Sequence, residues 1–264
     1  MFEKKVISVG MGIQSTALYL MSSMGEVERA DAAVFSDPGA EHPETYKLID
    51  WVLEWQRKNN GIPLYVVEKS LKDDILKGEN STGHKFATIP AFTKTKTGSA
   101  ILRRQCTREY KIFPVMKKIR DIYGLKKHKR MPMTELWLGI STDEASRMKD
   151  SMFPRIVNRY PLVEKHLSRS DCLAWMQKKK FPMPIKSSCV FCPYQSDSQW
   201  KNLKENQPES FRLAERIDDA IRNVSKKGKE EPIYLHRQLK PLGQVDFGKQ
   251  QDLFEDECEG YCGL

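Results

Sequence analysis

Short apolar runs alternate with stretches of helical spacing along the first part of the chain. A run such as Val6-Ile7-Ser8-Val9 has the length and the β-branched content of a buried strand. Apolar residues three and four positions apart indicate amphipathic helices instead. The pattern predicts strands within residues 4–9, 32–35, 63–67 and 135–140. It predicts helices from residue 15 onward, over residues 43–58 and over residues 111–123.

Strands and helices that alternate in this way favour a parallel sheet covered on both faces. We therefore expect an α/β fold in residues 1–165, a Rossmann-like, doubly wound and mostly parallel sheet. Cysteines, prolines and lysines accumulate after it, and residues 166–264 are expected to form a smaller cysteine-rich region with helices over 169–180 and 208–224. Residues 78–100 are rich in Gly, Thr, Lys and Ser, which predicts a mobile loop and a candidate lid over a site.

The charge balance indicates the class of partner that the protein binds. The 264 residues include 44 Lys and Arg against 35 Asp and Glu, a formal net charge of +9. This balance suits nucleotide phosphates or a nucleic acid, and a lysine-rich solvated surface is the alternative. The chain has no apolar run near the ~18 residues of a membrane helix, and its opening, MFEKKVISVG, lacks the apolar core of a secretory signal. We expect a cytoplasmic protein.

The first candidate for chemistry lies between the first predicted strand and helix, where the chain reads Gly10-Met11-Gly12-Ile13-Gln14-Ser15-Thr16. Glycines let the backbone approach phosphate oxygens, and a helix N-terminus adds free N–H groups and partial positive charge. The segment has neither the Walker A lysine nor the G-x-G-x-x-G spacing. A phosphate-binding loop and a tight structural turn both fit it.

The next predicted strand ends in Phe35-Ser36-Asp37-Pro38-Gly39 and continues to His42-Pro43-Glu44-Thr45-Tyr46, at the edge where open α/β sheets bind ligands. Together with the glycine loop, this stretch resembles the PP-loop family, the group of ATP pyrophosphatases and PAPS reductases. The loop of that family usually reads S-G-G-x-D-S, and its second strand ends in a D-T-G…P-E-T-Y-like stretch. Gln14 stands where the family has the aspartate associated with magnesium and pyrophosphate.

Further segments extend the resemblance over most of the chain. Arg104-Gln105-Cys106-Thr107 followed by Lys111 is similar to a Cys…K…P segment of the family, and Gly139-Ile140-Ser141 resembles its late-strand element. The resemblance implies ATP, or PAPS or APS, as the ligand, with magnesium as a further candidate. The nucleotide-binding residues that it indicates are Val9, Gly10, Gly12, Gln14, Ser15, Thr16, Ser36, Asp37, Gly139, Ile140 and Arg147.

The cysteines suggest a metal site. Six cysteines in a reducing compartment favour metal or redox chemistry over disulfides. The Cys189-x-x-Cys192 spacing can place two thiolates on one metal from a tight turn, with a redox pair or buried structural thiols as alternatives. A 4Fe-4S cluster could leave one iron open, whereas structural zinc would need four closed ligands. We favour the cluster, with Cys106 and Cys172 as the further candidate ligands.

The segment from Lys186 to Tyr194 and the one from Arg169 to Cys172 resemble the cysteine-bearing branch of the PAPS-reductase-like proteins, many of which are phage-associated. Reductases of this group carry a nucleophilic thiol in an E-C-G-L tail, to which Cys262-Gly263-Leu264 is faintly similar. Cys262, Cys258 and Asp37 are therefore the candidate catalytic residues. Alternatively, Cys258 and Cys262 complete the metal site.

Three functions follow from these expectations. The preferred one is an ATP-dependent, adenylating sulfur-transfer enzyme that releases pyrophosphate, takes sulfur from a donor and acts on a tRNA or DNA acceptor. The second is a reductase of PAPS or APS that is reset by a thioredoxin-type reductant. The third is a nucleotide-binding module without turnover.

Overall fold

The computed structural model describes residues 2–79, 82–83, 89–96, 98–222 and 231–248. Its strands are β1 Lys4–Ser8, β2 Ala32–Asp37, β3 Leu64–Glu68, β4 Phe92–Thr95, β5 Gly98–Ile101, β6 Thr134–Leu138, β7 Ile156–Arg159 and β8 Ile233–Tyr234. Its α-helices are α1 Ile13–Met24, α2 Pro43–Lys58, α3 Leu71–Leu76, α4 Phe113–Ile122, α5 Pro161–Glu164, α6 Arg169–Lys178, α7 Asp197–Asn206 and α8 Pro208–Ile221. A π-helix, η1, covers Thr107–Ile112, and the 3-10 helices η2 and η3 cover Thr142–Arg147 and Leu242–Gln244.

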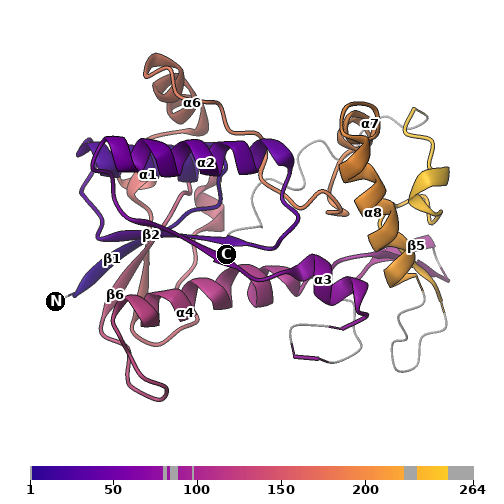
Figure 1. The fold of residues 1–264 in the computed structure, drawn as a ribbon, viewed down its shortest axis with the longest axis horizontal. Coiled ribbons are helices and arrows are strands. Elements are labelled where there is room, and N and C mark those ends of the chain that lie inside the picture. Colours follow the sequence, from indigo (N-terminus) through magenta and orange to yellow (C-terminus); the bar gives the residue numbers. More distant parts are fainter. Residues whose placement is uncertain (1, 80–81, 84–88, 97, 223–230, 249–264) are drawn as a thin grey trace.

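The main sheet is parallel, with the strand order β3-β2-β1-β6-β7. In Figure 1, α1 and α2 lie on one side of this sheet and α4 lies on the other. The order reverses between β1 and β6, so the carboxyl ends of these two strands form the topological switch point where open sheets bind ligands. The expected doubly wound α/β fold is confirmed.

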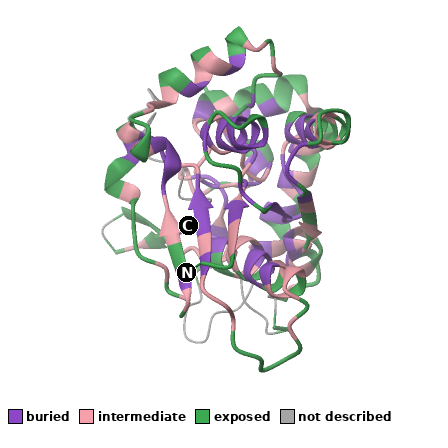
Figure 2. Ribbon diagram, turned by 90° about the vertical axis from the view of Figure 1, so that its left-hand side faces the viewer, coloured by how far each residue is buried: buried purple, intermediate pink, exposed green. Residues whose placement is uncertain are grey.

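Two cores enclose the main sheet. Alternate residues of each strand face opposite ways, so Ile7 packs with α1 and α2 whereas Val6 packs with α4. β2 is buried over its whole length and is apolar from Ala32 to Phe35, as is typical of a parallel strand covered on both faces. Figure 2 shows buried residues along the central strands and exposed residues on the outer helices.

A further core joins α3, α7, α8 and β8 beside the small antiparallel sheet β5-β4-β8. It takes residues from both sides of position 165, for example Tyr110 and Trp200, while α6 packs on α1 in the first core. The division of the chain into folding units at residue 165 stays a prediction.

Three local features differ from the sequence expectations. Residues 92–101 contain the antiparallel strands β4 and β5, so the interpretation of this stretch as a loop was wrong. The helix expected over 111–123 begins as the π-helix η1, and β7 was missed. Strands of four residues give little periodicity, because their pairing partners rather than their own sequence stabilise them.

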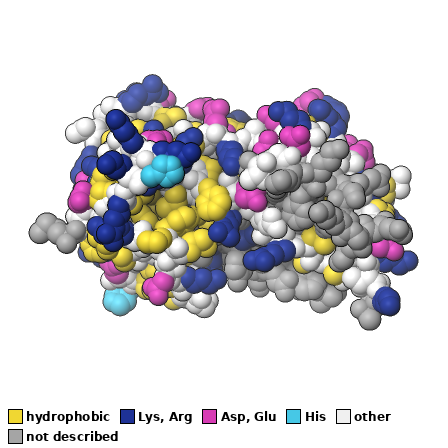
Figure 3. Space-filling model, turned by 90° about the horizontal axis from the view of Figure 1, so that it is seen from below, with side chains coloured by type: hydrophobic (Ala, Val, Ile, Leu, Met, Phe, Trp, Pro, Cys, Tyr) yellow, Lys and Arg dark blue, Asp and Glu magenta, His cyan; other side chains and the backbone are white. Residues whose placement is uncertain are grey.

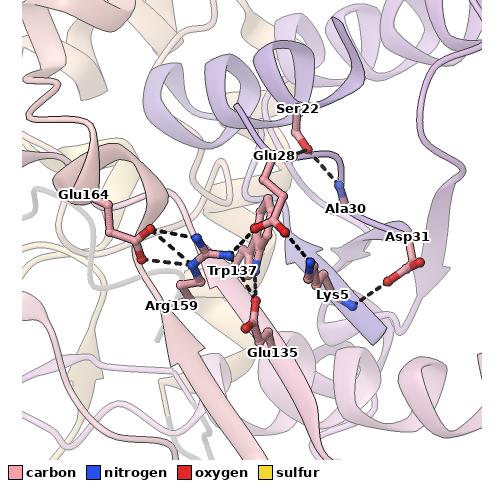
Figure 4. A network of polar contacts seen from close by, with 9 residues as sticks. All are labelled: Lys5, Ser22, Glu28, Ala30, Asp31, Glu135, Trp137, Arg159 and Glu164. Atoms are coloured by element: carbon pink, nitrogen blue, oxygen red, sulfur yellow. Dashed lines mark hydrogen bonds and ion pairs between the residues drawn. The ribbon is translucent and has the colours of Figure 1, made fainter. Parts of the chain in front are cut away.

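A polar network joins the strands on the face that carries α1 (Figure 4). The guanidinium of Arg159 on β7 donates to Glu28, Glu135 and Glu164, and Glu28 also pairs with Lys5 on β1. These ion pairs hold the carboxyl pKa of Glu28 below its usual range, chiefly through Lys5. Among the described helices, none combines the length and the apolar character that a membrane crossing requires.

Candidate functional site

A cavity of about 610 Å³ opens at the switch point between β1 and β6. Most of the residues that the sequence indicated for nucleotide binding line it: Val9, Gly10, Gly12, Gln14, Ser15, Ser36, Gly139, Ile140 and Arg147. They come from segments that follow β1, β2 and β6, which meet because the carboxyl ends of parallel strands share one edge of the sheet. The volume lies within the range of small-molecule pockets.

The glycine loop is held in a defined conformation at the cavity wall. Met11 is buried in the left-handed region, with φ 59°, which is uncommon for a residue other than glycine. The N–H of Gly10 donates to Ser15 Oγ at 3.1 Å, and that hydroxyl donates to the carbonyl of Gly12 at 3.3 Å. No side-chain hydrogen bond caps α1 at Gly12. The loop thus presents a helix N-terminus to the cavity, a favourable place for an anion.

The charges around the cavity are mostly positive. Five basic side chains line it, against the two carboxylates Glu144 and Asp150. The basic residues are Lys111, Arg147, Lys149, Arg169 and Lys186. Arg147 pairs with Glu144 at 2.6 Å, which leaves the positive side in excess. This balance suits a polyanionic ligand such as a nucleotide polyphosphate.

Another part of the cavity wall is apolar. Ile112, Val115 and Met116 contribute from η1 and α4, and Leu136 and Leu138 contribute from β6. An apolar surface beside a cationic one matches a ligand with a flat base at one end and phosphates at the other. The cavity can therefore accommodate both parts of a nucleotide.

Thr16 and Asp37 lie outside the cavity lining. Thr16 belongs to α1 and is fully buried. The Asp37 carboxylate accepts the N–H of Gly39 at 2.7 Å and the hydroxyl of Tyr46 at 3.0 Å, so it holds the turn that follows β2. Burial, together with the charge of Asp37, raises the pKa of Tyr46. Asp37 thus stabilises this turn, and the catalytic role that the sequence suggested for it stays a prediction.

A second, much smaller cavity of about 30 Å³ collects three of the six cysteines. Cys106 precedes η1, and Cys189 and Cys192 belong to a tight turn in which the N–H of Cys192 donates to the carbonyl of Cys189 at 2.9 Å. The other residues that line this cavity are mainly apolar, and Arg104 and Lys111 are the charged residues among them. Lys111 lines both cavities, so the thiol cavity adjoins the larger one.

Cys172 does not join the other three thiols. It is fully buried on α6, in the core around α1, whereas Cys106 and Cys189 pack against the core of α7 and α8. Burial, its largest cause, raises the pKa of the Cys172 thiol to about 12. The expectation that Cys172 is a metal ligand stays a prediction; helix packing, which the local sequence does not reveal, places this thiol in the core around α1 and apart from the thiol cavity.

Within the described ranges, no three His, Cys, Asp or Glu side chains form a ready-made metal site. Cys106, Cys189 and Cys192 share a cavity, but their thiols are not arranged around a common point in this structure. The candidate catalytic residues Cys258 and Cys262 lie outside the described residues.

The structure also brings forward residues that the sequence reasoning did not place in the site. Lys149, Arg169 and Lys186 line the large cavity, and the buried Glu41 pairs with Lys111 at 2.9 Å. The stretch directly before Cys189 was a usable signal, since Lys186 and the two serines that follow it line the large cavity. No sequence pattern pointed to Glu41, because its partners come from distant segments.

The face seen from below the view of Figure 1 carries a hydrophobic area bordered by Lys and Arg side chains (Figure 3). It lies over the half of the molecule that holds the main sheet. Among the exposed apolar residues, Met152 also lines the large cavity, and Phe113 stands edge-on to the cavity residue Phe153 at 6.2 Å. Arg108 lies over the ring of Phe113 at 5.2 Å. Apolar and cationic groups thus occur together near the cavity.

No protein-family model matches the chain. The chain is similar to a curated protein, the uncharacterized nin region protein ORF290 of Escherichia phage lambda, with 27% identity over 198 residues. That match covers 67% of this chain and 62% of the phage protein, so it spans about three-fifths of the relative's length. A solved structure, the U34-tRNA thiolase NcsA from Methanococcus maripaludis with its 4Fe-4S cluster, has 13% identity and a TM-score of 0.42. The alignment covers 87% of this chain and 74% of the thiolase.

Proposed function

We propose that the protein is a nucleotide-dependent sulfur-transfer enzyme that activates its acceptor with ATP. The observation that carries this proposal is the shared wall between the two cavities. Lys111 lines both the cavity at the glycine loop and the cavity of Cys106, Cys189 and Cys192. An activated acceptor in the first cavity would thus lie beside thiols in the second.

The reaction would take place in two displacements. An acceptor oxygen attacks the α-phosphorus of ATP, the bond to the β-phosphate breaks, and pyrophosphate leaves with its electron pair. Sulfur at the oxidation level of sulfide then attacks the adenylated carbon, and AMP leaves with the oxygen. No electrons are gained or lost, so the step needs positioning and charge neutralisation more than acid–base catalysis.

The residues of the large cavity would bind the nucleotide. Backbone N–H groups at the start of α1 and the side chains of Lys149, Arg169 and Lys186 would neutralise the phosphates. Lys111 and Arg147 also line the cavity, but each already pairs with a glutamate. The apolar wall between α4 and β6 would take the base. The assignment of Val9, Gly10, Gly12, Gln14 and the other lining residues to nucleotide binding is part of this proposal.

The thiol cavity would handle the sulfur. Three soft thiol donors beside one cavity are the kind of ligand set that an iron–sulfur cluster or zinc takes, although side-chain movement is needed to bring them to a common point. We propose Cys106, Cys189 and Cys192 as the ligands of a 4Fe-4S cluster, with zinc as the alternative. When bound through three thiolates, a cluster supplies an open iron to which sulfur can attach.

A nucleic acid is the acceptor class that the surface supports. The formal charge of +9 favours a polyanion. Exposed apolar groups such as Phe113 and Met152 beside cations offer stacking for an unpaired base next to contacts for phosphates. A tRNA or a single-stranded DNA region would fit this description.

The test uses full-length protein purified without oxygen, with iron, zinc and acid-labile sulfide measured first. The protein is then incubated with ATP, inorganic sulfide and either total tRNA or single-stranded DNA. We expect release of pyrophosphate and AMP that depends on one acceptor, together with sulfur incorporated into it. Sulfite release from PAPS with thioredoxin would establish the reductase instead, and ATP binding without turnover would establish a binding module.

A further inference from the structure

We propose that Glu41 is a positioning residue that holds the two cysteine-bearing segments together. One segment is η1, which begins directly after Cys106 and carries Lys111; the other is the stretch 187–192, which carries Cys189 and Cys192. The purpose of this arrangement rests on the proposed sulfur-transfer function. The arrangement itself can be tested without nucleotide, metal or acceptor.

The side chain of Glu41 connects both segments. One carboxylate oxygen, Oε1, accepts a hydrogen bond from Lys111 Nζ at 2.9 Å. The other, Oε2, accepts one from the hydroxyl of Ser187 at 3.1 Å. The Glu41 side chain is fully buried, and that of Lys111 is only 17% exposed. Because the Glu41 carboxylate is fully buried, loss of either partner would leave part of a buried charge without compensation.

The backbone around Glu41 reinforces the connection to the second segment. Glu41 forms an isolated antiparallel bridge with Cys189, and the N–H of Val190 donates to the carbonyl of Ala40 at 2.9 Å. The first segment has an anchor of its own, since Ser36 Oγ at the end of β2 donates to the carbonyl of Tyr110 at 2.7 Å. Glu41 thus supplies the side-chain contact that spans from one thiol-bearing segment to the other.

Because Glu41 contacts both segments, a positioning role can be distinguished from a general contribution to stability. Cys189 and Cys192 belong to one tight turn, and their separation depends on that turn. The separation of Cys106 from either of them depends on how the two segments are held. A change at Glu41 should therefore alter the distance between segments and leave the distance within the turn unchanged.

The test measures disulfide formation in the full-length chain, equilibrated in a chelating buffer with glutathione and glutathione disulfide. Each protein disulfide forms from two thiols as one glutathione disulfide is reduced to two glutathiones, so its yield reports the effective concentration of the pair. Peptide mass spectrometry separates the Cys189–Cys192 disulfide from disulfides that join Cys106 to either residue. In Glu41→Gln, we expect the effective concentration of the cross-segment pairs to fall by about tenfold or more and that of Cys189–Cys192 to change by less than about twofold.

Two further variants make the result specific. Glu44→Gln removes an exposed carboxylate nearby that pairs with Lys47 at the surface, and it should leave both kinds of disulfide unchanged. Ser187→Ala removes one of the two side-chain contacts and should give a smaller fall than Glu41→Gln, which also keeps the inference testable if the Gln variant does not fold. Equal falls for both pairs, no change in Glu41→Gln, or no cross-segment disulfide in the natural protein would overturn the inference. None of these outcomes depends on sulfur transfer, so failure of the proposed function would be recognised separately.

Discussion

The α-carbon of Ser15 lies so close to Gly139 that a Cβ atom at position 139 would sit only 2.6 Å from it and 2.7 Å from the Ser15 nitrogen. The end of β6 therefore touches the first turn of α1. Both residues line the large cavity, so this contact lies in the cavity wall at the switch point between β1 and β6. A residue with a side chain at position 139 could be accommodated only if one of the two backbones moved.

Gly139→Ala should therefore destabilise the fold and distort the site together. Overpacking against backbone that cannot yield costs about 1–3 kcal/mol in free energy of unfolding. Urea unfolding measures the loss, and ATP affinity should weaken in parallel. Gly124→Ala provides a comparison, because a Cβ there meets nothing within 4 Å and only the positive φ of 64° opposes it. Unchanged stability and affinity in Gly139→Ala would contradict the close contact.

Gly12→Val should weaken ATP binding without unfolding the protein. A Cβ on Gly12 meets nothing within 4 Å, and its φ of −89° suits any residue, so the variant should fold. The valine would occupy the space beside the amides at the start of α1, where we place the phosphates. We expect ATP affinity to fall at least about a hundredfold, or ~2.7 kcal/mol, as measured by calorimetry. Full affinity in a folded Gly12→Val protein would remove the loop from the site.

The cysteines should divide into two classes when they are replaced one at a time. A change to serine at Cys106, Cys189 or Cys192 should lower the metal affinity at least about tenfold. Even changes to residues that only support metal ligands lower it by about 10–100-fold. The Cys172→Ala variant should bind metal as tightly as the natural protein does, because Cys172 is buried in another core. Iron, zinc and sulfide analysis of the four variants after anaerobic purification provides the measurement. Metal loss in Cys172→Ala alone would reverse the assignment.

The buried thiol of Cys172 should make stability depend on alkaline pH. Its folded pKa is raised from the ordinary 9.0 to about 12 by burial, so its contribution is complete below pH 9 and is lost as the pH rises toward 12. The natural protein should therefore lose stability relative to Cys172→Ala over this range, and the comparison cancels the titration of tyrosines and lysines. Unfolding by urea at several pH values measures the difference in unfolding free energy between the two proteins, which should stay constant between pH 6 and 8 and shift toward Cys172→Ala above pH 9.

Arg159→Met should weaken the network that joins β1, β6 and β7. Arg159 pairs with three carboxylates while only 29% of its side chain is exposed, so its loss leaves Glu135 with an uncompensated charge near the sheet. We expect a loss of about 1–3 kcal/mol in unfolding free energy, smaller at high salt because ions screen the partly exposed pairs. Arg212→Met, at an exposed pair with Glu209, should cost no more than about 1 kcal/mol. Equal losses in the two variants would contradict a special role for the network.

The sequence determined the main sheet and its first helices because their signals are local. The helix predicted over 43–58 matches α2, and the strands expected at 32–35 and 63–67 correspond to β2 and β3 within a few residues. Hydrophobic spacing reports which faces must be buried, whatever they pack against. Once these strands are parallel, the switch point and the residues at its edge follow, which explains why most of the indicated nucleotide residues line one cavity.

The arrangement of the cysteines was decided by the tertiary structure. The chain alone offered Cys106 and Cys172 as equal candidates to join Cys189 and Cys192, yet Cys106 lies at the thiol cavity and Cys172 in the core around α1. Glu41 likewise acquires its role only when η1 and the segment before Cys189 reach it from opposite sides. Such contacts join segments far apart in sequence, and their free energy arises from burial and pairing in the folded chain, so no local pattern of residues records them.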